Sequence, residues 1–451
     1  MAARLDARPI FAAAASLAAA IYLAHTYRRR RRHLVRCEKY RLDPRYGFLP
    51  SSNASTLPPA FAELEGLASM LPTLNRSRSL AAAVRSLDPV AESEIEALTE
   101  REMRRLYVLL SAVAHSYVNG ALVPWEFFNL DEVKYHADAA DTGAAEPAAE
   151  LPRMISADTS AEPAAELPRV ISAPWLHACE RLGLPPVYVA TGMDLWNHTL
   201  ELPTAPWFWP EPAALLDAFG LRIATTGGAA EVAFHAVPFA IQVQLAHLLP
   251  ALIDAPADVA RRRWRTLAAL CGEIAAALRR CLSLLQQVAP RLDPAEFYDV
   301  YRPLLGGWDA RGLVLRGTGT TTRAKGPSAG QTALLILLDV VLGVAHKEET
   351  RAFQLEMRTG YLPRPHRALL EDVAADVARS GSLRAAAADA AAPAALRDAH
   401  RRAIDALAAF RSFHLGMATK YLRRTDKGTG ASDFRSMLKE AVESTREGRV
   451  R

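Results

Sequence analysis

Long apolar stripes at helical spacing occupy the C-terminal half of this sequence and restrict what it can fold into. They run over Val232 to Asp254, Val259 to Val288, Ser328 to Val344 and Ala394 to Tyr421. Apolar residues that recur at three- and four-residue steps mark one face of a helix. Alanine, the strongest helix former, is abundant, whereas runs of alternating β-branched residues are scarce. The sequence therefore predicts an all-α protein.

The 451 residues are long enough for two or three domains. We expect an apolar segment with an arginine block over residues 1–38, a small and mainly helical domain over 39–225, and a large helical domain over 226–447 that carries the functional site. A stretch near residue 145 returns near residue 161, which we interpret as a duplicated loop over 145–172. Residues 306–327, rich in Gly and Thr, are expected to form a loop that is either functional or disordered.

The N-terminal residues combine an apolar run with a block of positive charge. Pro9 to Tyr27 carries no charged side chain, and Arg28 to Arg32 follow directly. This run just reaches across a bilayer core, and positive charge after it would leave the main domain facing the cytoplasm. Arg4 and Arg8 among alanines equally fit a transit peptide to the mitochondrion or another organelle. Membrane association through residues 9–32 and organellar targeting both remain open.

Charge and motif content exclude several classes of protein. The net charge of +5 equals the five arginines of the block, so the rest of the chain is close to neutral and no nucleic-acid partner is expected. The four cysteines form no CxxC pair and are expected to be reduced thiols. The sequence also lacks the GxSxG, HExxH and GxxxxGK[ST] patterns of hydrolases, zinc peptidases and P-loop proteins.

Two polar residues stand out within apolar helices. His414 shares one side of the last long helix with Phe410, Arg411 and Met417. A neutral imidazole among such side chains is what an axial haem ligand needs, although a lone helical histidine is more often an ordinary core or surface residue. Asp339 interrupts an apolar run, and a buried carboxylate requires a cationic partner, for which we choose Arg411.

Arg302 lies among the aromatic residues Phe297, Tyr301 and Trp308. An arginine in this setting binds a carboxylate while the rings enclose an apolar body. The alternative is an arginine that only covers an aromatic cluster at the end of a helix.

Read together, these segments resemble the indoleamine 2,3-dioxygenase family of haem enzymes. The resemblance covers about Lys39 to Glu447 and is strongest after Ala229. Its motifs stand in the family's order: Pro294 to Arg302, Gly307-Trp308, Gly312 to Val314, Gly326 to Gln331, Asp339 to Gly343, Met357-Arg358, Pro363 to Leu369, Arg411 to His414, Thr419 to Tyr421 and Gly428 to Gly430.

The resemblance implies a haem b cofactor with His414 as the proximal ligand of its iron. Arg411 and Asp339 resemble the supporting pair near this ligand. Ser328 and Ala329 resemble the loop over the haem edge.

On the substrate side, Arg302 resembles the arginine that holds the substrate carboxylate. Phe297 resembles the ring that lines the distal face, and Phe234 resembles a ring that packs on the indole. Thr429 resembles a mobile lid residue near the amino-acid end of the substrate.

The implied reaction inserts both atoms of O2 across the indole C2–C3 bond of tryptophan and gives N-formylkynurenine, the first step of the kynurenine pathway. No side chain is expected to act as a catalytic acid or base. The implied partners are tryptophan or a related indoleamine, O2 and an electron donor that keeps the iron ferrous. We expect a monomer.

The chain departs from the mammalian pattern inside the pocket. Pro238 stands where those enzymes have a distal serine, with His235 nearby in uncertain register, and Ala190 and Met193 fall near their pocket tyrosine and cysteine. These departures leave open a non-catalytic haem- or oxygen-binding relative of the same fold. A haem-free helical scaffold tethered to a membrane is a further alternative, which only the N-terminal segment supports.

Overall fold

The computed structural model describes residues 31–125 except 32, residues 164–200, residue 202, and residues 211–450 except 423, 431 and 432. The N-terminal apolar run and most of the duplicated loop lie outside these described residues. In chain order the elements are η1 (Pro59–Phe61), α2 (Ala62–Ser69), α3 (Leu71–Arg76), α4 (Leu80–Arg85), α5 (Glu92–Glu96), α6 (Glu100–Asn119), η2 (Gly120–Leu122), β1 (Glu166–Leu167), α7 (Arg169–Leu182), η5 (Thr191–Leu195), α8 (Pro212–Ala218), α9 (Ala229–Ala246), α10 (Leu249–Ala260), α11 (Trp264–Gln286), η6 (Glu296–Tyr301), α12 (Arg302–Leu304), β2 (Leu313–Leu315), β3 (Thr320–Thr322), η7 (Ala329–Gln331), α13 (Ala333–Leu342), α14 (Glu348–Tyr361), α15 (Arg364–Ser380), α16 (Leu383–Ala388), α17 (Ala394–Tyr421) and α18 (Phe434–Glu447).

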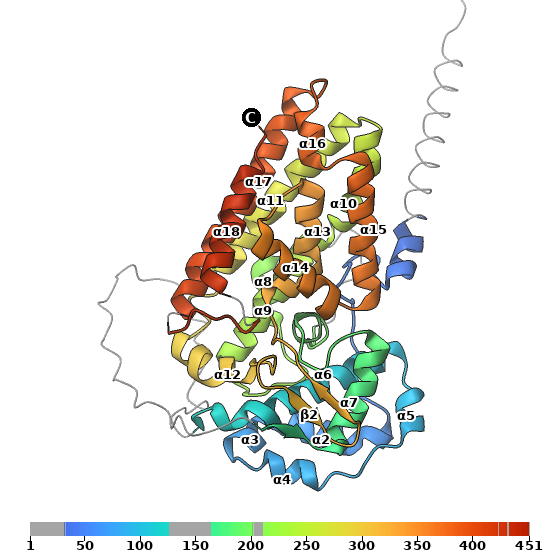
Figure 1. The fold of residues 1–451 in the computed structure, drawn as a ribbon, viewed down its shortest axis with the longest axis vertical. Coiled ribbons are helices and arrows are strands. Elements are labelled where there is room, and N and C mark those ends of the chain that lie inside the picture. The colour runs from blue at the N-terminus through green and yellow to red at the C-terminus, as the bar shows by residue number, and fades with distance from the viewer. Residues whose placement is uncertain are drawn as a thin grey trace, which may run out of the picture.

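Helices dominate this list, and the predicted all-α class is confirmed. The helices α9 to α11 and α13 to α18 form a large bundle, and the short helices α2 to α5 lie with α6 and α7 at its lower end (Figure 1). The three short strands also lie at this lower end, where β1 pairs in parallel with β2 and β2 pairs antiparallel with β3. The strand pairing therefore brings residues 313–322 back onto the smaller part, while the domain boundary at 225/226 stays a prediction.

The predicted loop at residues 306–327 contains this hairpin. Leu313 and Leu315 of β2 are buried, and Gly317 and Gly319 in the turn have φ angles of 77° and 70°. Glycine adopts this left-handed conformation without the steric cost that a Cβ would add. The segment therefore contains a polar turn, as expected for a loop rich in Gly and Thr. It differs from the predicted loop because Leu313 and Leu315 form a strand that packs into the core.

The helix α17 has the predicted bounds and packs along α11 (Figure 1). The buried face of α11 includes Leu267, Leu270, Ile274 and Leu278, at three- and four-residue steps. In α17 the buried face ends at Phe410, and the rest of the helix to Lys420 is only partly buried. This change of burial inside one helix marks the point where packing gives way to a cavity.

Two predicted stripes are broken by local chemistry. The stripe from Val232 to Asp254 is divided into α9 and α10, and Pro250 stands in the first turn of α10, where its missing N–H costs no hydrogen bond. The stripe from Val259 begins as the end of α10, and the chain turns at Arg262, with a φ of 52°, before α11 starts. Periodicity does not detect such breaks, because the apolar spacing continues across them.

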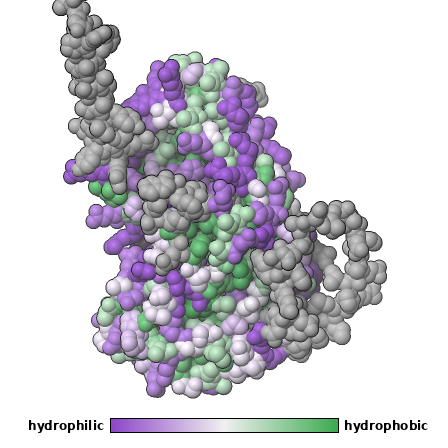
Figure 2. All heavy atoms as spheres, turned by 180° about the vertical axis from the view of Figure 1, so that it is seen from behind, coloured by the Kyte–Doolittle hydropathy of each residue, from purple (hydrophilic) through white to green (hydrophobic). Residues whose placement is uncertain are grey.

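The helix α9 is long and apolar enough to cross a membrane, with a mean hydropathy of 1.2 over its 18 residues. It is the only such helix among the described residues, and 78% of it is buried inside the fold, which is typical of a core helix. The face in Figure 2 shows mostly hydrophilic residues at the margins, with hydrophobic residues gathered along the middle of the molecule.

Candidate functional site

A cavity of about 350 Å³ lies inside the large bundle. Its walls come from α9, α11, α13, α14, α17 and α18, together with residues 327–330 and 428–430. The lining is mainly apolar, which suits a flat hydrophobic ligand with few polar contacts. Of the residues that the sequence singled out, the following line this cavity: Phe234, Phe297, Ser328, Ala329, Asp339, Arg411, His414 and Thr429.

His414 faces this cavity from α17, on the same side as Phe410, Met417 and Tyr421. Its ring makes no hydrogen bond to any described residue. Burial, together with the nearby positive charge of Arg411, lowers the pKa of His414 from 6.5 to about 4. The imidazole is therefore neutral at physiological pH, and its nitrogen lone pair is available to a metal.

One helical turn before His414, Arg411 forms a buried ion pair with Asp339. The Arg411 Nη2 donates to both carboxylate oxygens of Asp339, at 2.7 and 2.6 Å, and Nη1 donates to the Thr445 hydroxyl. Burial alone would raise the pKa of Asp339, but the charge of Arg411 and the hydrogen bond from His346 outweigh it and lower that pKa to about 2. The partner chosen from the sequence is thus confirmed.

Asp339 has two further donors that the sequence analysis missed. The His346 Nε2 and the Gln354 Nε2 donate to its Oδ2 at 3.0 and 3.2 Å. The chain returns to Asp339 because Gly343 ends α13 with a φ of 80° and donates its N–H to the Asp339 carbonyl at 2.9 Å. A glycine stop three residues before a histidine is the sequence signal that could have revealed His346.

Aromatic rings from two elements form the opposite wall. Phe234 of α9 and Phe297 of η6 stack at 24°, with ring centroids 5.2 Å apart, and both line the cavity. Pro238, one turn after Phe234, also lines it, as do Ala190 and Met193. Stacked phenyl rings beside small side chains leave a flat apolar slot, into which an aromatic ring system fits.

Two loops meet at the edge of the cavity and carry Ser328 and Thr429. The Thr429 hydroxyl donates to the Pro327 carbonyl, and Gly326 donates its N–H to the Thr429 carbonyl at 3.1 Å. A Cβ on Gly430 would lie 3.0 Å from the Ser328 Cβ. The glycines therefore allow the two backbones to approach closely and close this edge.

Arg302, unlike the other residues expected to bind haem or substrate, does not line the cavity. Its Nη2 donates to the Lys427 carbonyl at 2.8 Å, and its guanidinium lies 5.2 Å from the centre of the Tyr298 ring. Its Nε has no hydrogen-bond partner among the described residues. Arg302 therefore lies beside the loop that carries Thr429, and a role in binding a carboxylate remains a prediction.

His235, whose register was uncertain, lies behind this wall. Its Nδ1 donates to the Met193 carbonyl at 3.0 Å, and its Nε2 accepts from the Tyr301 hydroxyl at 2.6 Å. Burial lowers the pKa of His235, so this ring is neutral and both of its nitrogens are used. It has no free nitrogen for a ligand in the cavity.

The chain belongs to the indoleamine 2,3-dioxygenase family, whose sequence model matches residues 36–447. A 6-hydroxytryptophan 2,3-dioxygenase of Fusarium equiseti is 28% identical, over 90% of this chain and 89% of its own length. The indoleamine 2,3-dioxygenase 2 of Homo sapiens is 24% identical, over 91% and 94%. A myoglobin of Haliotis madaka is also 24% identical, over 91% and 98%.

The enzymes of this family depend on haem, and the residues of this cavity fit such a group. Among the described residues no three His, Cys, Asp or Glu side chains come together to hold a bare metal ion. A porphyrin supplies its own four nitrogens, so a single neutral imidazole such as His414 is sufficient as a protein ligand. The apolar walls would enclose the macrocycle, and Ser328 and Ala329 would lie at its edge.

Proposed function

We propose that this protein is a haem-dependent dioxygenase that opens the indole ring of tryptophan or a close derivative. The observation that carries the proposal is the neutral imidazole of His414, which has no hydrogen bond to a described residue and faces a large apolar cavity. The product would be N-formylkynurenine or its substituted analogue, with both atoms of O2 retained. Bound haem would supply the oxygen chemistry, while the protein binds, orients and excludes water.

On the side of the haem that His414 would bind, the protein would hold this axial ligand in a fixed orientation. Asp339 holds Arg411 from both carboxylate oxygens, and Arg411 precedes His414 by one turn of the same helix. This contact stiffens the helix at the place where the ring must keep its orientation, because buried charge pairs with several hydrogen bonds resist rearrangement.

The distal side would orient the substrate without acid–base catalysis. Phe234 and Phe297 would pack against the flat indole, and the dry cavity would keep water from the reacting carbons. Arg302 would bind the substrate carboxylate after releasing the Lys427 carbonyl, and Thr429 would close over the amino-acid end.

The direct test is turnover of L-tryptophan by haem-loaded, reduced protein in the presence of isotopically labelled O2. We expect N-formylkynurenine that contains two labelled oxygen atoms. A product with one labelled atom, or no product from tryptophan and its ring-hydroxylated derivatives, would contradict the proposal.

A second candidate is a haem protein that binds O2 without opening an indole. Pro238 in the cavity wall and the similarity to the Haliotis myoglobin favour it. The two candidates differ in one measurement: the oxygen carrier would release O2 unchanged in the presence of tryptophan, whereas the dioxygenase would consume both substrates in equal amounts.

A further inference from the structure

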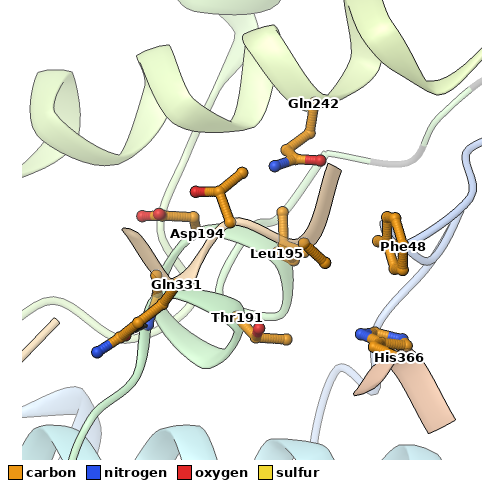
Figure 3. A pocket seen from close by; sticks show the side chains of 10 residues that line it. Phe48, Thr191, Asp194, Leu195, Gln242, Gln331 and His366 are labelled. Atoms are coloured by element: carbon orange, nitrogen blue, oxygen red, sulfur yellow. Dashed lines mark hydrogen bonds between the residues drawn. The ribbon is translucent and has the colours of Figure 1, made fainter. Parts of the chain in front are cut away.

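A small side chamber adjoins the main cavity, between η5, α9 and η7 (Figure 3). It has a volume of about 10 Å³, which is room for one water-sized group. It shares four lining residues with the main cavity: Ala190, Asp194, Gln242 and Thr332. Because the side chain of Ala190 is only a methyl group, little separates the chamber from a ligand in the main cavity.

Asp194 brings an unused carboxyl group to this chamber. The residue is only 8% exposed, and its Oδ1 has no hydrogen-bond partner among the described residues. The nearest basic group, the His235 Nδ1, is 3.6 Å away and already donates to the Met193 carbonyl. Burial raises the pKa of Asp194 well above its usual range, and that of His235 is lowered. Burial therefore favours the protonated carboxyl, which has an O–H to donate and an oxygen to accept.

Gln242 adds a second polar group with free capacity. It lies on α9 in line with Phe234 and Pro238, and like them it lines the main cavity. It is 6% exposed, and its side-chain amide makes no hydrogen bond to another described residue. Gln331, in the same chamber, differs, because its amide accepts from the Ala190 N–H at 2.9 Å and donates to the Gly326 carbonyl at 3.1 Å.

Buried polar groups without partners are costly. Asp194 and Gln242, together with the unpartnered Nδ1 of His366 in the same lining, therefore indicate a polar group that completes the site. The orientation that an indole amino acid would take in the main cavity indicates which polar group could reach the chamber. Its charged amino-acid end belongs near the edge that carries Thr429, beside which Arg302 lies, and this leaves the benzene ring for the enclosed interior. A substituent on that ring would point into the part of the cavity where Asp194 and Gln242 lie.

We propose that Asp194, assisted by Gln242, binds a hydroxyl group on the benzene ring of the indole, so that the preferred substrates are ring-hydroxylated tryptophans. This inference rests on the proposed function and narrows its substrate class. The carboxyl O–H would donate to the hydroxyl oxygen, and the carboxyl carbonyl oxygen would accept a hydrogen bond from the hydroxyl. The chamber would hold a water molecule when the ring carries no hydroxyl. Asp194 would thus be a specificity-determining residue.

The test compares dissociation constants of the haem-loaded protein for L-tryptophan, 5-hydroxy-L-tryptophan and 6-hydroxy-L-tryptophan, from the shift of the Soret band. We expect the wild-type protein to bind one of the hydroxylated compounds about tenfold or more tightly than tryptophan. Asp194→Val, which removes the polar group at similar size, should abolish that preference, so that the ratio of the dissociation constants for tryptophan and the hydroxylated compound falls to about one. Asp194→Asn, which keeps hydrogen-bonding capacity, should retain part of it. The matched control is Asp376→Asn, an exposed aspartate of α15 outside both cavities.

Equal affinities in the wild-type protein, or a preference that survives in Asp194→Val, would overturn the inference. If Asp194→Val does not bind haem, Gln242→Leu takes its place, and the preference should fall in the same direction. Failure of the proposed function has a different signature, because none of the three compounds would then be oxidised, whatever their affinities.

Discussion

The guanidinium of Arg411 binds both carboxylate oxygens of Asp339, at 2.7 and 2.6 Å, across 72 residues of sequence. The two side chains are only 12% and 5% exposed. This pair connects α13 to α17 directly beside the cavity, so it influences the fold and the orientation of His414 together. Several of the following predictions depend on it.

Loss of the cation from this pair should destabilise the fold. Arg411→Ala leaves the carboxylate of Asp339 buried with only His346 and Gln354 as donors, and breaking a buried pair in this way costs about 3–5 kcal/mol of unfolding free energy. Urea denaturation of the haem-loaded protein would measure it. Arg401→Ala is a suitable control on the same helix, because its exposed pair with Asp398 should contribute less than about 1 kcal/mol. A loss equal to that of the control would dismiss the structural role of the pair.

Because the pKa of Asp339 is lowered in the fold, we expect the free energy of unfolding to decrease at acidic pH. The pKa of Asp339 is about 2 in the fold, below its usual 3.8, so its stabilising contribution is complete above about pH 4 and is lost as pH falls through 2. The difference corresponds to about 2 kcal/mol of unfolding free energy. Unfolding measured between these pH values in wild-type protein and Asp339→Asn should show that the variant lacks this part of the acid limb. If the wild-type protein and Asp339→Asn lost stability by the same amount over this pH range, the result would contradict the assigned role of Asp339.

His414→Ala should remove most of the bound haem, since no other histidine among the described residues lines the cavity. The absorption spectrum of purified, haem-supplemented protein measures this, with circular dichroism to show that the helices remain. His247→Ala, which changes a histidine outside the cavity lining, should bind haem normally. Normal haem content in His414→Ala would defeat the axial assignment.

Arg302→Ala should raise the KM for tryptophan about tenfold or more, because a carboxylate would lose a charged partner, while the Soret band of substrate-free protein stays unchanged. Arg424→Ala is a close control: Arg424 also lies over the Tyr298 ring, at 4.1 Å, but its charge is already paired with Asp299 at 2.6 Å. Steady-state kinetics of the two variants separate the roles. An equal change in KM for both would count against Arg302 as the anchor.

We propose that residues 9–32 direct the protein to a membrane or an organelle, and removal of residues 1–33 should change its location but not its turnover. The residues that follow this segment are attached to the large bundle without it, because Arg36 pairs with Asp254 of α10 and Lys39 binds Asp372 of α15 at 2.7 Å. Cell fractionation and kinetics of the truncated protein test both parts. An unchanged distribution would rule out an address in this segment, and lost turnover would show that it belongs to the catalytic fold.

Much of the architecture follows from local sequence patterns. The stripe from Ala394 to Tyr421 predicts α17 with its exact bounds, because apolar spacing and helix-favouring alanines act within one turn of their own position. The break at Arg262 and the strand at Leu313 escaped prediction, since each depends on what packs against it.

The sequence by itself determined the family, the helical class and the presence of a carboxylate that needed a cation, because motifs and burial preferences are properties of the chain. Only the tertiary structure decided that His346 and Gln354 also hold that carboxylate, that Arg302 turns to a backbone carbonyl, and that Asp194 lies without a partner in the wall of the cavity. These are relations between distant segments. Their energies depend on which groups folding brings within hydrogen-bond distance and which it removes from water.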